Sequence, residues 1–136
     1  MVKTSFPKKT LLISIIADES TVTGFLLTGI GQRGKDGSAN FMICNKQTTD
    51  AEIEETLTKY LSRDDIAIVM IAQSLAERVR NMIVEHQNNE DKVLPTILEI
   101  PSKDAPYDPL KDTMLVAAAQ KRFGQEAGLQ ILKNDD

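Results

Sequence analysis

The sequence of 136 residues has very little of the residue types on which metal and thiol chemistry depend. It contains one cysteine and one histidine. A lone Cys44 cannot form an internal disulfide bond, and His86 has no second ligand at a spacing that suits zinc. We interpret Cys44 as a small buried hydrophobe at the end of an inner strand, and His86 as a surface residue near the end of a helix. The sequence therefore predicts no metal, no cofactor and no catalytic residue.

The chain also lacks an excess of positive charge and a long apolar run. Sixteen basic residues against twenty acidic ones give a formal net charge of −4. Binding to nucleic acid requires a basic face that neutralises phosphates, and a membrane-spanning helix requires about 20 apolar residues in succession. We expect no nucleic-acid partner and no direct insertion into a membrane.

One apolar stretch superficially resembles a secretory signal. Lys8 and Lys9 precede the apolar segment Leu11–Ala17. No small-residue cleavage pattern follows it, and the acidic residues Asp18 and Glu19 come directly after. We interpret the segment as a first buried strand.

What the sequence does contain is a strand that is apolar on both faces. Asp64–Gln73 has polar ends around an uninterrupted apolar stretch, which is typical of a parallel sheet covered by helices. Ser74 and Glu77 directly behind it have the spacing of a helix capping box. A strand followed at once by a helix is half of a βαβ unit.

The same alternation runs through the first hundred residues and predicts an α/β fold. Strands are expected at Thr10–Ile16, Asn40–Cys44, Ile66–Ile71 and Leu94–Ile100. Helices are expected at Ser20–Thr28, from the capping box Thr49–Glu52 onward, and after Ser74, where the charged run Glu77, Arg78 and Arg80 reads as a solvated face. The two most apolar strands belong in the middle, and Pro95 favours a sheet edge for the fourth. We predict a small doubly wound, four-stranded parallel sheet of order 2-1-3-4.

The predicted organisation has four parts: a short N-terminal tail (1–9), the sheet domain (10–100), a proline-rich linker (101–109), and a C-terminal helix and tail (110–136). Asp108 and Pro109 are typical of a helix start, and one helix is expected over Leu110–Lys133, weakened by Gly124 and Gly128.

Apolar residues recur every four positions along this helix, and no strand follows it. The row consists of Leu115, Ala119, Phe123, Ala127 and Ile131. Either the helix folds back on its own sheet or it extends to a partner, or its two halves do one each. Burial of a Leu, Phe or Ile side chain contributes about 1.5–3 kcal/mol, so we expect the row to be covered in one of these ways.

Two segments have the residue types of a ligand site. Gly29–Gly34 matches G-x-G-x-x-G, but a helix precedes it and a charged loop follows, which reverses the order that dinucleotide binding needs. Asp18, Ser74 and Lys103 lie at the predicted crevice and resemble a phosphate-binding receiver domain, although Gln73 stands where a phosphate-accepting carboxylate is needed. The competing interpretation is that Asp18 and Ser74 cap helices.

Four blocks of sequence, in order, resemble the F subunits of vacuolar-type, proton-translocating ATPases. They are DESTVTGFLLTGIG (18–31), Asn40-Phe41, RDDIAIVMIAQ (63–73) with Ala76-Glu77, and LPTILEIPSKDAPYDPLKD (94–112). The resemblance covers about residues 8–120, and the last block is similar to the eukaryotic form. The loop 32–38 and the segment 88–92 depart from the pattern.

The resemblance implies a non-catalytic subunit of the central stalk, or rotor. In that family, the F protein pairs with the coiled-coil D protein, and the stalk couples ATP hydrolysis in the ring of A and B proteins to proton transport, with the d protein towards the membrane. The location implied is cytosolic, peripheral on vacuolar or other internal membranes. On this interpretation the expected partner contacts are Gly29, Gly31, Arg33, Leu115, Ala119 and Phe123.

Overall fold

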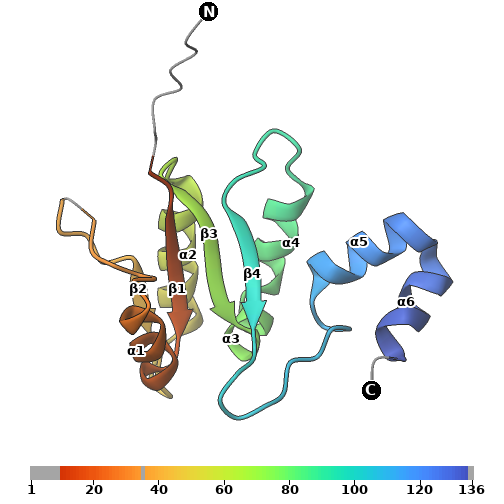
Figure 1. The fold of residues 1–136 in the computed structure, drawn as a ribbon, viewed down its shortest axis with the longest axis horizontal. Coiled ribbons are helices and arrows are strands. Elements are labelled where there is room, and N and C mark those ends of the chain that lie inside the picture. Colours follow the sequence, from red (N-terminus) through yellow and green to blue (C-terminus); the bar gives the residue numbers. More distant parts are fainter. Residues whose placement is uncertain (1–9, 35, 135–136) are drawn as a thin grey trace, which may run out of the picture.

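The structure, a computed structural model, describes residues 10–34 and 36–134, so the predicted tail at 1–9 lies outside the described residues. Figure 1 shows one sheet with helices on both faces and a separate pair of helices beside the last strand. The four strands are β1 (Leu12–Ala17), β2 (Phe41–Ile43), β3 (Ile66–Ala72) and β4 (Thr96–Ile100). All pairs are parallel and the order is β2-β1-β3-β4. The predicted fold class and strand order are confirmed, and the apolar run 11–17 contains β1.

The sheet packs a different set of helices on each face. On one face, Ile16, Val69 and Ile97 pack against α2 (Asp50–Ser62), α3 (Gln73–Arg78) and α4 (Arg80–Asn88). On the other face, Ile15 and Met70 pack with α1 (Glu19–Leu27), which is the one helix packed there among the described residues. Side chains alternate between the two faces along each strand, so β1 and β3 are buried on both sides.

Capping residues determine where the first two helices begin. The Asp18 carboxylate accepts the Thr21 N–H at the start of α1. Thr49 and Glu52 form the predicted capping box of α2. Gly24, in the middle of α1, does not bring that helix close to the sheet, since a Cβ built there would meet no atom within 4 Å.

The prediction for the third helix was wrong in its start and its continuity. The helix begins at Gln73, and Ser74 does not cap it; instead the Ser74 N–H donates to the Ser102 hydroxyl at 2.9 Å. The backbone then breaks at Val79, whose N–H donates to the Ala76 carbonyl three residues back, and α4 starts afresh. The break lets Arg78 and Arg80 point to different neighbours.

The C-terminal segment is two helices, not the single predicted one. Asp112 rather than Asp108 is the N-cap, so α5 spans Thr113–Phe123, and α6 spans Gln125–Lys133. Gly124 has φ +87°, a left-handed backbone conformation that non-glycine residues rarely adopt, and it turns the chain back. The two helices form a hairpin to the side of β4 and α4 (Figure 1).

Candidate functional site

The C-terminal helices expose apolar side chains that the sheet domain does not cover. None of the residues of α5 is buried; Leu115 is 37% exposed and Phe123 is 51% exposed. The Arg122 guanidinium lies 5.7 Å from the centre of the Phe123 ring. Ile131 on α6 is also 43% exposed. The predicted row is therefore not packed on its own sheet.

Ala119, in the middle of the predicted row, has a contact within the hairpin. A Cβ built on Gly128 would lie 2.8 Å from the Ala119 backbone, so α6 approaches α5 as closely as the backbone allows. Ala119 is half-buried for this reason. The glycine that the sequence pattern treats as a weak point of one helix is a packing requirement of two.

The glycine-rich segment after α1 has one exposed functional side chain. Gly29 (φ +92°) ends the helix, and the N–H of Gly31 donates to the Ile13 carbonyl at 3.1 Å. Gly31 is buried against Ile15. Arg33 is exposed and donates to the Gly37 carbonyl. Because the G-x-G-x-x-G letters follow a helix end and precede β2, no helix N-terminus faces them as dinucleotide binding needs.

The crevice at the carboxyl ends of the strands does bring Asp18, Ser74 and Lys103 together, around a cavity of about 420 Å³. Its polar groups already have partners. Burial opposes the ionisation of Asp18, but hydrogen bonds from Ser20 and Thr21 outweigh it and lower the pKa to about 2. The Ser102 hydroxyl donates to Ser74 at 2.8 Å. Asp18 therefore acts as a helix cap, as the competing interpretation expects.

Gln73, the residue that departs from a receiver site, holds the linker. Its side-chain amide donates to the Asp108 carbonyl at 2.8 Å, and its carbonyl accepts the Asp108 N–H at 2.7 Å. Gln73 is only 5% exposed. This pair of hydrogen bonds joins the end of β3 to the start of the C-terminal segment, 35 positions away.

A buried ionic cluster continues from this point towards α5. Arg80 donates two hydrogen bonds of 2.8 Å to Glu99, so its predicted place on a solvated face was wrong. The Glu99 side chain on β4 is 2% exposed. Asp112 accepts the N–H groups of Met114 and Leu115 at the start of α5. It also accepts the Tyr107 hydroxyl at 2.5 Å.

Burial raises the pKa of the Glu99 carboxyl above its usual range. Hydrogen bonds from Arg80 oppose this rise, whereas the charge of Asp112 and a hydrogen bond with its side chain add to it. Burial also raises the pKa of Tyr107, and its hydrogen bond to Asp112 adds to the rise. The phenol thus remains a donor to the carboxylate.

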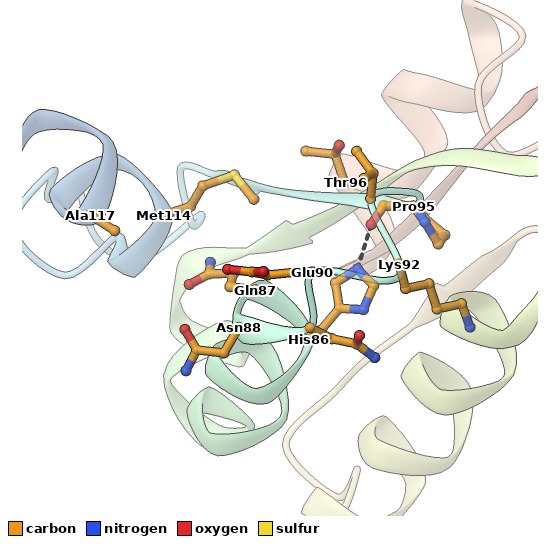
Figure 2. A pocket seen from close by; sticks show the side chains of 11 residues that line it. His86, Gln87, Asn88, Glu90, Lys92, Pro95, Thr96, Met114 and Ala117 are labelled. Atoms are coloured by element: carbon orange, nitrogen blue, oxygen red, sulfur yellow. Dashed lines mark hydrogen bonds between the residues drawn. The ribbon is translucent and has the colours of Figure 1, made fainter. Parts of the chain in front are cut away.

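Figure 2 shows a cavity of about 350 Å³ where α4, the following loop and α5 meet. Met114 and Ala117 of α5 line one side of it, and the opposite side comes from the end of α4 and the segment before β4. His86 donates from Nε2 to the Pro95 carbonyl at 2.6 Å, so it is half-buried and not the surface residue that was predicted.

Sequence reasoning missed the linker contacts because they join residues far apart in the chain. One signal was available: Glu99 is a charged residue inside the apolar segment Thr96–Ile100, and such a side chain needs a partner when buried. Cys44 is buried as expected, and burial raises its pKa to about 11. It follows β2, however, which is an edge strand and not an inner one.

Membrane-spanning helices and metal-binding clusters are both absent from the described ranges, 10–34 and 36–134. No helix there is long and apolar enough to cross a membrane. No cluster of three or more His, Cys, Asp or Glu side chains there has an arrangement that could hold a metal ion.

Comparison with known proteins gives a consistent answer. Residues 13–117 match the protein family described as "ATP synthase (F/14-kDa) subunit". The chain is 50% identical over 104 residues to the F subunit of the V-type proton ATPase of Homo sapiens, covering 76% of this chain and 84% of the human protein. It is 46% identical over 108 residues to the protein of the same name from Dictyostelium discoideum, covering 79% of this chain and 87% of that protein.

A third relative, from Drosophila melanogaster, is the first of that organism's numbered V-type proton ATPase F subunits. It is 46% identical over 104 residues, covering 76% of this chain and 81% of that protein. The region that matches the family includes the whole sheet except the first residue of β1, the linker with its hydrogen bonds to Gln73, and the start of α5. The chain therefore belongs to the family of V-type proton ATPase F subunits, which are non-catalytic subunits of a proton pump.

Proposed function

We propose that this chain is a central-stalk subunit that pairs with the coiled-coil D protein of the pump and couples ATP hydrolysis in the A/B ring to proton transport, with the d protein as a further partner. The observation that supports this best is the uncovered apolar surface of α5 and α6, where Leu115, Phe123 and Ile131 stay exposed. A coiled coil offers a matching row of apolar side chains, and each Leu, Ile or Phe covered contributes about 1.5–3 kcal/mol.

The proposed contacts are of two kinds. On α5 they are Leu115, Ala119 and Phe123, of which Ala119 also faces α6. In the loop after α1 they are Gly29, Gly31 and Arg33. There the buried Gly31 fixes the shape of the loop, and the exposed Arg33 is the side chain available to a partner. The proposed location is the cytosolic face of vacuolar or other internal membranes, as part of the assembled pump.

A binding measurement with two matched variants tests the helix contact. Phe123→Glu places a charge in the row, whereas Ala118→Glu places the same charge on another exposed position of α5. We expect Phe123→Glu to weaken binding to the coiled-coil D protein by at least about tenfold, because burying an unpaired carboxylate is costly. Ala118→Glu should bind as the parent does. Equal affinity of all three proteins would remove the row from the interface.

A receiver-like, phosphate-binding signalling domain is the alternative function. It requires Asp18 or a neighbour to accept a phosphoryl group, yet Asp18 caps α1 and Gln73 binds the linker. Incubation with acetyl phosphate followed by mass spectrometry separates the two proposals. A stalk subunit should stay unlabelled, and a label on Asp18 would favour the receiver.

A further inference from the structure

The C-terminal helices are attached to the sheet domain mainly through polar groups. The chain leaves β4 at Ile100, and the hydrogen bonds of Gln73 to Asp108 fix the linker over the end of β3. Beyond this point, α5 shares no buried apolar residue with the core. Its attachment therefore depends on what holds its first turn.

The first turn is held by Asp112, which is 7% exposed. Its Oδ1 accepts the N–H groups of Met114 and Leu115, both at 3.1 Å, and its Oδ2 accepts the Tyr107 hydroxyl. An N-cap of this kind contributes to helix formation, and here it also links the helix to whatever surrounds the carboxylate. That surrounding is the buried pair Arg80–Glu99.

The cluster contains one guanidinium and two carboxylates. With both Glu99 and Asp112 ionised, it would carry a net charge of −1 in a place where Glu99 is 2% exposed. Burial of an unbalanced charge is costly, and two neighbouring carboxylates commonly hold one proton between them. With one proton on the pair, the cluster with Arg80 is neutral.

Other charged groups lie around the cluster and do not balance it. Glu77 on α3 acts on Arg80, and Lys111 of the linker pairs with Glu77 at 3.2 Å, so these two charges cancel each other. Tyr107 is a neutral donor, and Asp108 adds a further negative charge near it. The groups facing Glu99 from β4, α3, α4 and the linker therefore leave an excess of negative charge.

We propose that Glu99 and Asp112 share one proton while α5 is docked, so that attachment of the C-terminal helices to the sheet domain is linked to pH. The direction follows from the raised pKa of Glu99. The docked state binds the proton more tightly than an undocked state, in which Glu99 would have its ordinary pKa. Docking is then favoured at lower pH and weakens as pH rises through the raised pKa.

The test is a carboxyl-carbon and amide NMR titration of the full chain alone, between about pH 5 and about pH 8. We expect Glu99 to titrate above its ordinary value of 4.5, with the Met114 and Leu115 amide signals moving at the same midpoint. Above that midpoint the ratio of docked to undocked α5 should fall by up to about tenfold per pH unit. Titration of Glu99 at or below 4.5, or unmoved Met114 and Leu115 amides, would overturn the proposal.

A variant and a control refine the result. Glu99→Gln keeps the size of the side chain and can donate to Asp112, and it leaves the cluster neutral at every pH used. The amide transition at Met114 and Leu115 should disappear in this variant. Glu55→Gln, at an exposed position of α2 that pairs with Lys59, should leave the transition unchanged. If Glu99→Gln does not fold, the titration of the unaltered chain still decides.

The titration needs only this chain, so its outcome is independent of which partner covers α5. A negative titration leaves the binding of the coiled-coil D protein untouched, and a failure of that binding leaves the titration untouched. If both hold, the pH of the surroundings changes how firmly the apolar surface of α5 is presented to the coiled coil.

Discussion

Thr49 and Glu52 satisfy each other's backbone at the start of α2. The Thr49 hydroxyl accepts the Glu52 N–H at 3.3 Å, and the Glu52 carboxylate accepts the Thr49 N–H at 2.7 Å. This exchange pairs two donors that the helix itself cannot pair. Because α2 contributes Ile53 and Leu57 to the core, its start matters for the whole domain.

Thr49→Ala should therefore lower the free energy of unfolding by about 1 kcal/mol. Thr58→Ala is the matched control, since Thr58 is exposed on the same helix and its hydroxyl donates only to the Glu54 carbonyl. Urea unfolding of the three proteins measures the difference. A loss for Thr58→Ala as large as that for Thr49→Ala would mean that the capping box is not the cause.

Asp18 makes stability depend on pH at the acid end. Its pKa is about 2 in the folded chain against an ordinary 3.8, so the folded state gains from the ionised form. This contribution is complete above pH 3.8 and is lost as pH falls from there through about 2.

We expect Asp18→Asn to lose less stability on acidification than the parent does. Asparagine caps helices about as well as aspartate, so the two proteins should be similarly stable at neutral pH. Urea unfolding between about pH 2 and about pH 5 checks this. Parallel decline of the two proteins would show that the Asp18 hydrogen bonds do not stabilise the ionised form.

At the scale of elements, two glycines near α1 have opposite roles. Gly24 lies in the helix with open space around it, whereas Gly31 has φ +82° and its absent Cβ would lie 3.3 Å from Ile15. Gly24→Ala should raise the free energy of unfolding by about 1 kcal/mol, because alanine favours the helix. Gly31→Ala should lower it. Thermal unfolding of both variants provides the check, and destabilisation by Gly24→Ala would contradict the open space.

Short-range patterns predicted the sheet and its order because burial on both faces leaves apolar runs that are visible in the chain. They did not predict the break at Val79 or the turn at Gly124. Both depend on tertiary contacts: Val79 is buried in the core, and Gly128 packs on Ala119. The linker contacts were equally invisible, since Gln73 and Asp108 are 35 positions apart.

The candidate surface was predicted in part for the same reason. The spacing of Leu115, Ala119 and Phe123 is local, and it correctly indicates an apolar row on a helix. What covers that row depends on another chain or on distant parts of this one. The structure leaves Leu115 and Phe123 exposed, which narrows the choice to a partner or to a different position of the hairpin.

At the scale of the whole molecule, a well-packed sheet domain carries a helical hairpin through a polar joint. Gln73, Glu99 and Asp112 form that joint, and their side chains bond to other groups of this chain. The crevice, where other doubly wound proteins bind ligands, is lined in part by side chains that bond to one another. This division of roles fits a non-catalytic subunit that transmits force between partners.

The most direct measurement is co-expression of the chain with the coiled-coil D protein, followed by size-exclusion chromatography with light scattering. A stalk subunit should form a stable complex with the mass of one copy of each chain, and the chain alone should not turn over ATP. Separate elution of the two chains, or turnover of ATP by the purified chain, would contradict the proposed function.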